Sequence, residues 1–592
     1  MSGRETVGDL ATAVGAISRD LSVDVTMNQV GFLLGAQKTC VLAGEGSSAF
    51  AVIRLESGEA GYRGALQAPR GDLGAFRVGD FSALQEPGTY YVQAGGSRSY
   101  PFRIGHDVYD PILQMMVRYF SLQRCGLSAT GYLAPCHCDD GVRLDNGAHQ
   151  DVTGGWHDAS DLRKWVGATL YGMIGLARTL DRLQPEWGTA ILDELRCGNR
   201  YFLAMQEPAG YVMSHVGGDV AQHADSSRWT DNLVGEPGGQ VATVAPLPGG
   251  SSAQVTVIGA RDDSALLCRR VIQTEPLDRF GQHTFCIAEA TMARLTRQSD
   301  PAYSARCLTA ASRCLDWCIA SGFAETAGEY GVAIGSAVAL YRASGQSQFR
   351  DLAADSARRL AALQVKEAVD AALPVRGFYR TSATNPEPYR DIWHGCWQLI
   401  GLCELIEALP GDPDAPAWRD AVALYARDYL LTLSRRSAYA IVPFGLFAGH
   451  DPGGNRRVGA YWYRYFMPPR DWWVGINANL ASAGVGLLKA ARILQDARLS
   501  AIAQRQLDWI LGANPFYAST VEDVGHNHPR QFVNSHEFRP PTPRLPGAVM
   551  NGLGGTVDDQ PDRCDGSYHT AEYWTPMVAY TMWLMAELER TP

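Results

Sequence analysis

The feature that most constrains the fold of this chain is an apolar helical stripe that recurs from Asp107 onward. Between Lys164 and Leu183, apolar residues follow the three- and four-residue spacing that places them on one face of a helix. The same spacing predicts twelve helices, over residues 108–124, 164–183, 187–206, 283–298, 301–321, 328–344, 347–365, 398–409, 416–434, 474–495, 498–512 and 569–589. The fold is therefore expected to be mainly α, although this count alone fits several large helical architectures.

Residues 22–106 carry a different pattern. Short runs rich in Val, Ile, Tyr or Phe alternate with Gly- and Pro-bearing turns at the spacing of a β-sandwich. The predicted strands are Ser22–Met27, Lys38–Leu42, Ala49–Leu55, Gly88–Gln93 and Tyr100–Ile104. We therefore predict two domains, a small β-sandwich over 22–106 and a helical domain over 107–592. A Gly-, Pro-, Ser- and Val-rich stretch at 235–262 is interpreted as an insertion or flap, because helices resume on both sides of it.

Composition excludes some classes of function. The 592 residues carry a net charge of −10, which argues against the basic surface that nucleic acid requires. No apolar run of about 18 residues predicts a membrane span, and the first ten residues do not resemble a secretory signal. The 13 cysteines, an odd number, favour reduced thiols over a disulfide scaffold. A cytoplasmic location is expected, although a secreted chain trimmed of its signal would look the same, and the oligomeric state stays open.

The residues with the clearest chemical meaning are Asp151–Asp161, which read DVTGGWHDASD. This string places two carboxylates, Asp158 and Asp161, three residues apart behind a Gly-Gly pivot and an aromatic residue. Two carboxylates so close raise each other's pKa, so one of them can act as a base on a shared water. Spacing alone does not choose between the two, and an isolated pair of this kind is more often a helix cap or a solvated turn.

The whole string resembles the catalytic-base signature of glycoside hydrolase family 9, in which a Gly stands at the position of Ser160. This resemblance implies an (α/α)6 barrel that hydrolyses glycosidic bonds with inversion, with Asp161 as the base and Asp158 helping to hold the water. Asn28–Phe32, followed by Lys38, resembles the start of the immunoglobulin-like module that precedes some family 9 catalytic domains. The predicted sandwich is therefore expected to be that immunoglobulin-like domain.

An inverting glycosidase also needs an acid on the other side of the sugar, about 6.5–9.5 Å from the base. Glu572 opens an apolar C-terminal helix, where Tyr573 and Trp574 could desolvate it and raise its pKa. The region resembles the acid motif of the family, although Ala571 stands where Asn is usual. Without the resemblance, a Glu in the first turn of a helix is usually a partner of the helix dipole.

Three further segments resemble family 9 sequence: Gln506–Pro515, Val524–Pro529 and Pro546–Gly555. Between the last two, the family carries a His-x-Arg that contacts the sugar. The nearest equivalent here is His536-Glu-Phe-Arg539, which is one residue longer. The resemblance therefore implies that His536 and Arg539 bind substrate, and the alternative interpretation is a surface loop.

Aromatic residues cluster in or beside predicted loops, at Trp393–Trp397, Tyr461–Tyr463 and Trp472-Trp473. Such rings can stack on the C–H faces of sugars, and they can equally fill the core of a barrel. We predict that Trp393, Tyr573 and Trp574 contact substrate. Arg390 and Asp391, beside Trp393, are of the kind that orients sugar hydroxyls.

The sequence also predicts a structural zinc. Cys125, Cys136, His137 and His157 supply two thiols and two imidazoles, a set that favours tetrahedral zinc. Family 9 members with the immunoglobulin-like module commonly hold a structural zinc with this ligand set. Cys138 is a competing ligand, and Cys and His residues that merely pack together are the alternative.

Calcium is a second candidate metal. An acidic loop before Glu572 could hold calcium through hard oxygen ligands, or it could simply be solvated. The loop carries Asp558, Asp559, Asp562 and Asp565.

The implied reaction is inverting hydrolysis of β-1,4-glucosidic bonds in cellulose-type β-glucans or their oligosaccharides. Exo action on imported oligosaccharides fits the expected cytoplasmic location. One alternative is an exo-β-glucosaminidase acting on chitosan oligosaccharides, which would need a further carboxylate such as Glu537 or Asp391. A non-catalytic carbohydrate-binding barrel and a lyase acting on uronic acid polymers are the others. The lyase would need a Tyr or His base beside cationic groups.

Overall fold

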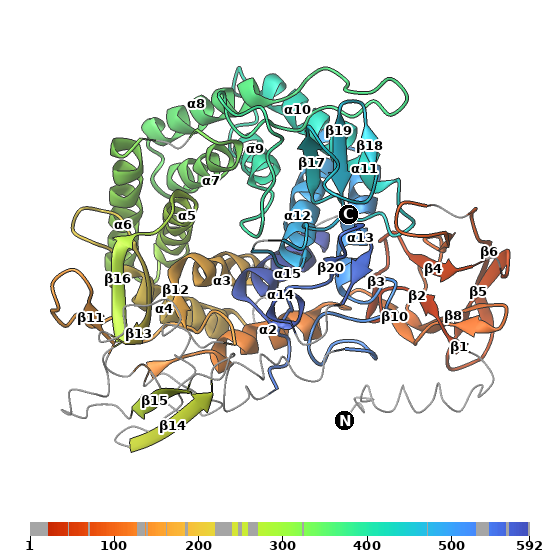
Figure 1. Ribbon diagram of the computed structural model, residues 1–592, viewed down its shortest axis with the longest axis horizontal. Coiled ribbons are helices and arrows are strands. Elements are labelled where there is room, and N and C mark those ends of the chain that lie inside the picture. Colours follow the sequence, from red (N-terminus) through yellow and green to blue (C-terminus); the bar gives the residue numbers. More distant parts are fainter. Residues whose placement is uncertain are drawn as a thin grey trace.

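The structure is a computed structural model of the 592-residue chain. It describes residues 22–44, 46–68, 71–126, 137, 140–160, 163–180, 182–183, 187–219, 240–246, 252–258, 270–322, 325–470, 472–528, 544–563 and 567–589. A β-sandwich lies beside a ring of paired helices (Figure 1).

Two sheets make up the sandwich. One has the strand order β1-β9-β8-β10-β3, with β5 joined to β8 and β6 joined to β5, and the other has the order β2-β4-β7. Its core includes three mutually contacting rings, Phe32, Phe81 and Phe102, with centroids 5.7–5.8 Å apart. The strands are β1 Ser22–Val23, β2 Val25–Thr26, β3 Gly31–Leu33, β4 Thr39–Ala43, β5 Ala49–Arg54, β6 Ala60–Ala65, β7 Phe76–Asp80, β8 Gly88–Ala94, β9 Ser97–Arg98 and β10 Phe102–Gly105.

Every predicted strand and every predicted helix has a counterpart in the structure. Strands β3, β6, β7 and β9 were not predicted, because they are short or interrupted by glycine. The helices are α2 Asp110–Leu122, α3 Val166–Leu180, α4 Gly188–Ala204, α5 Arg279–Thr296, α6 Pro301–Ala320, α7 Ala327–Ser344, α8 Ser347–Leu363, α9 Trp397–Ala408, α10 Ala415–Ala423, π-helical η3 Leu424–Leu431, α11 Thr432–Ser434, α12 Asn477–Leu494, α13 Ala497–Ile510, α14 Tyr568–Ala571 and α15 Thr575–Leu588.

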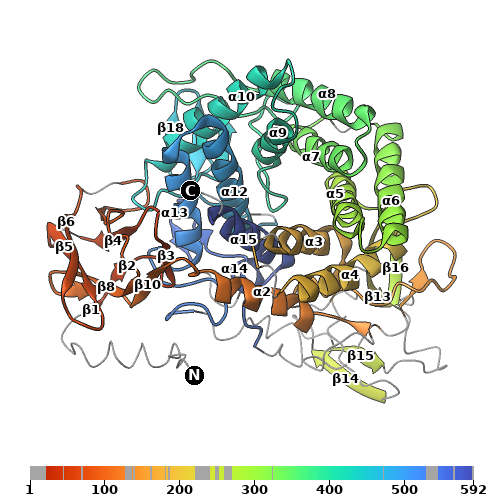
Figure 2. The ribbon, with the colours of Figure 1, turned by 180° about the vertical axis from the view of Figure 1, so that it is seen from behind.

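The helices form a closed double ring. Within the described chain, α3, α5, α7, α9, α12 and α15 each pack on the next, and α15 returns to α3. Helices α2, α4, α6, α8, α10 and α13 lie outside this ring, so that outer and inner helices alternate along the sequence (Figure 2). The predicted (α/α)6 barrel is confirmed.

Small residues let the inner helices approach each other closely. A Cβ added to Gly175 of α3 would lie 2.8 Å from the Cα of Ala579 on α15. A Cβ added to Gly401 of α9 would lie 2.3 Å from the carbonyl oxygen of Gly331 on α7. Nearly every residue of α3 and α15 is buried, whereas outer helix α8 buries only one face. Backbone contact of this kind tolerates no side chain, so these glycines are required by packing.

An ion network occupies the end of the barrel where the inner helices finish. Nζ of Lys489 lies 2.8 Å from Glu404, 2.9 Å from Glu407 and 3.7 Å from Glu587. Burial alone would raise the pKa of Glu404, but the surrounding cations hold that pKa well below its ordinary value. These cations are Arg178, Arg342 and Lys489. Cations at the C-terminal ends of helices also interact favourably with the helix dipoles.

The sandwich and the barrel share a polar interface. The side-chain amide of Asn28 donates to Asp508 of α13 at 3.1 Å, and the amide of Gln29 donates to the carbonyl of Tyr517 at 2.8 Å. Farther along the interface, the hydroxyl of Tyr463 donates to Asp72 at 2.6 Å. Asn28 and Asp508 both belong to segments that resemble family 9 sequence, and the structure assigns them to the contact between the domains.

The remaining strands form small sheets around the barrel, and β14 pairs with β15 between α4 and α5. This hairpin agrees with the prediction of an insertion at 235–262. None of the helices in the described chain is long and apolar enough to cross a membrane. The strands are β11 Val142–Arg143, β12 Lys164–Trp165, β13 Met213–Asp219, β14 Gln240–Pro246, β15 Ser252–Ile258, β16 Arg270–Pro276, β17 Gly445–Ala448, β18 Arg457–Val458, β19 Tyr461–Arg464, β20 Gly554–Gly555 and β21 Pro561–Asp562.

Replacing the buried ammonium of Lys489 tests the ion network. We expect Lys489→Met to lower the free energy of unfolding by about 3 kcal/mol at neutral pH, because Glu404 and Glu587 keep their buried charges with one cation fewer. The loss should shrink as pH falls, since the carboxylates then take up protons. Denaturant unfolding at several pH values measures both effects. Arg350→Met removes an exposed ion pair with Asp351 and should leave stability unchanged; an equal loss in both variants would contradict this account.

Candidate active site at the mouth of the helical barrel

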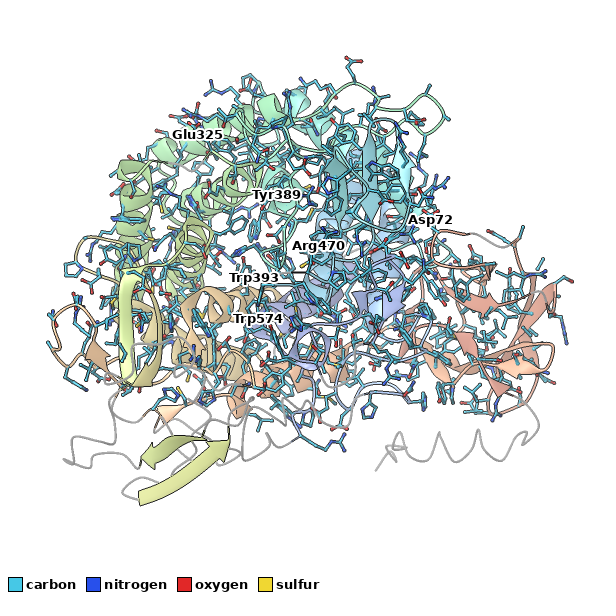
Figure 3. All side chains as sticks on the ribbon, viewed as in Figure 1. Asp72, Glu325, Tyr389, Trp393, Arg470 and Trp574 are labelled. Carbon is cyan, nitrogen blue, oxygen red and sulfur yellow. The ribbon has the colours of Figure 1, made fainter. Side chains whose placement is uncertain are left out.

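The loops that precede the inner helices gather at one mouth of the barrel. Asp158–Ser160 precede α3, Glu572–Trp574 precede α15, Trp393 precedes α9 and Trp472 precedes α12. Figure 3 shows Trp393 and Trp574 at the centre of the ring, with Tyr389 and Arg470 around the same opening. The ring therefore brings together residues that lie far apart in the sequence.

The two predicted catalytic segments are in direct contact. The hydroxyl of Ser160 donates to Oε1 of Glu572 at 2.5 Å, and the indole N–H of Trp574 donates to Oδ2 of Asp158 at 3.0 Å. Ala159 pairs with Trp574 as an antiparallel β-bridge. The backbone N–H and the hydroxyl of Thr575 both donate to the carbonyl of Asp158, at 3.0 Å and 2.9 Å. These bonds fix the loop of residues 154–160, called the base loop from here on, against the segment Glu572–Trp574, which carries the predicted acid.

The Gly-Gly pivot has a clear structural reason. Gly154 and Gly155 have φ of 86° and 80°, in the left-handed region that disfavours other residues. A Cβ on Gly155 would lie 2.8 Å from the Cβ of Tyr201, which is fully buried. The pivot turns the chain so that Asp158, itself only 2% exposed, reaches the mouth of the barrel. Asp161, the predicted base, lies outside the described residues.

Glu572 stands between two helices and not in the first turn of one. It follows α14 with extended backbone angles of φ −73° and ψ 138°, and α15 begins at Thr575. Its carbonyl accepts the N–H of Asn551 at 2.7 Å, and its side chain is half-buried. The interpretation of Glu572 as a helix-dipole partner is therefore wrong, and its carboxyl faces the base loop through Ser160.

Aromatic rings form a row at the mouth. Trp472, which is 47% exposed, contacts Trp574 edge to face with centroids 6.4 Å apart. The ring centroids of Trp574 and Trp393 are 4.7 Å apart, and those of Trp393 and His394 are 3.8 Å apart. His394 in turn stacks on Phe280 of α5 at 4.4 Å. The row runs from solvent toward the wall of the barrel, past the side chain that is bonded to Asp158.

Other aromatic residues singled out from the sequence belong to the core. Tyr573 is fully buried and packs edge to face on Tyr119 of α2 at 6.0 Å. This position corrects its predicted role as a substrate contact, because a ring with no exposed surface in the core cannot receive a sugar. Trp397 and Tyr463 are each 2% exposed and also serve packing.

Arg390 and Asp391 organise the loop that presents Trp393. Asp391 accepts the N–H of Gly395 at 2.5 Å, and burial raises the pKa of Asp391 to about 7. Arg390 is paired with Glu387 at 2.8 Å and lies over the ring of Phe447. Asp391 therefore holds the turn before α9, and Arg390 joins Glu387 to the carbonyl of Leu446 on β17, whereas the sequence predicts that both contact sugar hydroxyls.

The predicted zinc ligands are described in part. The imidazole rings of His137 and His157 have centroids 5.6 Å apart, and Nδ1 of His137 lies 2.8 Å from Oδ2 of Asp140. Such a carboxylate commonly orients a metal-bound imidazole. Cys125 is buried beside the same loop, with its N–H bonded to the carbonyl of Gly155 at 3.1 Å. Cys136 lies outside the described residues, and among those described no three His, Cys, Asp or Glu side chains converge closely enough to hold a metal.

The acidic loop before Glu572 uses its buried carboxylate for protein cations. Asp559 is fully buried and accepts the N–H groups of Tyr465 and Phe466 at 2.9 Å and 3.0 Å. Arg456 donates to it, and Arg464 lies 3.5 Å away. These partners occupy both oxygens of Asp559, so this residue is not a calcium ligand. Asp565 lies outside the described residues.

Two of the predicted sugar contacts, His536 and Arg539, also lie outside the described residues. Sequence reasoning missed the contact between Ser160 and Glu572, as well as the stacking of His394 on Phe280. The only signal for the first was a hydroxyl where the family motif has Gly. For the second, no local pattern links residues on α5 and before α9.

Comparison with known proteins agrees with this geometry. Residues 109–585 match glycosyl hydrolase family 9, and residues 21–99 match the cellulase N-terminal ig-like domain. The fold and the two facing acidic segments thus define a helical-barrel protein of the glycosidase type. The chain belongs to glycosyl hydrolase family 9.

Two curated relatives resemble part of the chain. A cellodextrinase of Butyrivibrio fibrisolvens is 33% identical over 219 residues, which is 32% of this chain and 39% of that protein. Endoglucanase D of Acetivibrio thermocellus is 32% identical over 213 residues, which is 31% of this chain and 34% of that protein. Each match therefore spans well under half the length of the relative.

Solved structures share the whole fold. A single-mutant thermostable endoglucanase from Alicyclobacillus acidocaldarius superposes with a TM-score of 0.66 at 19% identity, covering 96% of this chain and 100% of that chain. A Zn-binding triple mutant of the family 9 endoglucanase J30 gives 0.64 at 21% identity, covering 94% and 99%. At this level of identity the likeness establishes the arrangement of sandwich and barrel.

The pivot in the base loop can be tested by adding one methyl group. Gly155→Ala forces a Cβ against Tyr201, whereas Gly147→Ala, at a similar φ of 72°, meets no atom within 4 Å. Both changes carry the cost of a left-handed backbone, about 1–2 kcal/mol. We expect Gly155→Ala to lose about 2 kcal/mol more, through overpacking. Thermal unfolding of the two variants measures the difference, and equal losses would show that the contact with Tyr201 is unimportant.

Proposed function

We propose that this protein is an inverting glycoside hydrolase that cleaves β-1,4-glucosidic bonds in cellulose-type β-glucans or their oligosaccharides. The observation that carries the proposal is the direct contact between the loop of Asp158 and the segment of Glu572. Acids on two facing segments at an open mouth suit a reaction that needs one carboxylate on each side of a glycosidic bond. Membership of family 9 supports the same reaction.

In this mechanism Asp161 takes a proton from a water that attacks the anomeric carbon, and Asp158 helps to hold that water. Glu572 gives its proton to the departing oxygen on the opposite face, so the configuration inverts. The indole of Trp574 donates to Asp158 and fixes the orientation of this carboxylate. Each turnover leaves Asp161 protonated and Glu572 ionised, and exchange with solvent restores both.

The aromatic row suggests where the sugar chain binds. Trp472, Trp574 and Trp393 offer rings from the solvent-exposed rim to the catalytic segments. Sugars stack on such surfaces through their C–H faces, so we place successive glucose units along this row, with His536 and Arg539 as further contacts. One curated relative is a cellodextrinase, which supports short oligosaccharides as substrates of this chain as well.

An exo-β-glucosaminidase is the second candidate. It would need a carboxylate facing the ammonium of the sugar, and Asp391 is instead bonded to the turn before α9. This engagement of Asp391 favours the glucan over the amino sugar; Glu537, the other candidate carboxylate, lies outside the described residues. A binding barrel without catalysis would not require an acid bonded to the base loop, and this contact favours the hydrolase.

The reaction can be tested on ladders of cello-oligosaccharides and chitosan oligosaccharides. We expect the wild type to release short products from the cello ladder, with the inverted anomer detected by NMR before mutarotation. Asp161→Ala and Glu572→Ala should each lower kcat by at least about a hundredfold, because general acid–base groups contribute factors of that order. Asp351→Asn, an exposed acid far from the mouth, serves as the control. Cleavage of the chitosan ladder alone would replace the glucanase assignment by the glucosaminidase.

We also propose that Cys125, Cys136, His137 and His157 hold a structural zinc. The spacing of the two imidazoles and the carboxylate behind His137 support this ligand set. One similar solved structure is a Zn-binding variant of a family 9 enzyme. A closed four-ligand site leaves no position for water, so the metal would be structural. Because His157 directly precedes Asp158, the metal would hold the base loop in place.

Elemental analysis tests the zinc site without relying on activity. We expect about one zinc per chain in protein purified without chelator, and much less after Cys136→Ser. The thermal midpoint should fall in parallel, because metal binding contributes to folding free energy. Cys197→Ser, at a partly exposed cysteine of α4, is the matched control and should keep its zinc. Wild-type protein that contains no zinc would refute the proposal.

A further inference from the structure

Ser160 occupies a position that the proposed mechanism does not use. It lies between Asp158 and Asp161 in the sequence and is 1% exposed. Its hydroxyl donates to Oε1 of Glu572 at 2.5 Å, across a sequence separation of 412 residues. The family motif has Gly at this position, so this contact is particular to the side chain that the present chain carries.

We infer that Ser160 is a positioning residue for the proposed acid: its hydroxyl ties the carboxyl of Glu572 to the base loop and sets the pH range in which that carboxyl keeps its proton. The inference rests on the assignment of Glu572 as the acid. Its physical basis is that a donor directed at a carboxylate stabilises the ionised form, and short O–H···O⁻ bonds of about 2.5–2.7 Å are the strong ones.

The surroundings of Glu572 explain why such a donor matters. Among the described residues, Asp158 of the base loop and Glu572 both act electrostatically on Tyr119 of α2, and Tyr568 and His569 belong to α14, directly before Glu572. Burial lowers the pKa of His569, whose ring is stacked on Trp473, so this imidazole is neutral at pH 7. A nearby carboxylate and a partly buried site both favour the protonated acid. Ser160 acts in the opposite direction and keeps the carboxyl able to release its proton.

Ser160 also fixes the direction in which the carboxyl of Glu572 points. Glu572 has extended backbone and stands between α14 and α15. The bond to Ser160 selects one orientation of the carboxyl with respect to Asp158 and Trp574. An acid that is free to rotate spends less time in line with the departing oxygen, which lowers kcat more than it changes KM.

The test uses full-length protein with Ser160→Ala, Ser160→Gly and Ser160→Thr. Glycine is the residue of the family motif, so this variant is expected to fold, and threonine retains the hydroxyl. We expect the Ala and Gly variants to lower kcat by about tenfold at unchanged KM. We also expect the alkaline limb of the kcat/KM profile to move up by about one pH unit, since the acid then holds its proton longer. The Thr variant should keep the wild-type profile.

Ser304→Ala is the matched control, because it removes a buried serine that donates to the carbonyl of Ala293 at 2.6 Å, away from the mouth. It should change stability without moving the pH profile. A lower melting temperature in Ser160→Ala with an unmoved alkaline limb would overturn the inference and leave Ser160 a packing role.

A second readout separates this inference from the proposed function. Carboxyl-labelled glutamate gives a ¹³C signal for Glu572, assigned through Glu572→Gln, whose titration is followed in wild type and Ser160→Ala. An upward shift of about one unit in the variant supports the inference even if no substrate is cleaved. Identical titrations overturn it. If the wild type cleaves no substrate but Ser160→Ala still shifts the titration of Glu572, only the proposed reaction is refuted.

Discussion

The structure depends on the packing of the last inner helix, α15, on the first, α3. Gly175 allows the two backbones to approach until a Cβ would be 2.8 Å from Ala579. This contact closes the ring of inner helices. Since both helices begin at the same mouth, the segments that precede them lie side by side, and Asp158 and Glu572 face a common opening. The site is therefore a consequence of ring closure.

The two ends of the barrel differ in their electrostatics. At the mouth, Asp158 and Glu572 stand on the segments that precede α3 and α15. At the opposite end, Arg178, Arg342, Lys489 and Arg492 meet Glu404 and Glu587. That network joins inner helices through charges that are compensated and desolvated. Buried ion pairs thus join the helices at this end, whereas the mouth carries the exposed ring of Trp472.

Much of the fold was predictable because the amphipathic period of each outer helix is local. Inner helices such as α15 are buried on nearly every side, so their stripe is weaker, although the helical spacing of apolar residues still indicated them. The break of the C-terminal segment at Glu572 was not predictable, because it depends on bonds from Asn551 and Ser160. Tyr573 and Trp574 show the same limit. They are adjacent aromatics with equal sequence support, yet one fills the core against Tyr119 and the other reaches the mouth.

The sequence by itself determined the order of sandwich and helices, the identity of the family motif and the glycines on which the pivot at Gly154-Gly155 depends. These follow from local periodicity and from backbone angles that only certain residues adopt. The tertiary structure alone decided that Ser160 bonds Glu572, that Asp391 holds a turn, and that Asp559 is paired with arginines. Each of these pairings joins groups that ring closure or a folded loop brings together. The role of a carboxylate depends on the donors that surround it, and no local sequence pattern specifies those donors.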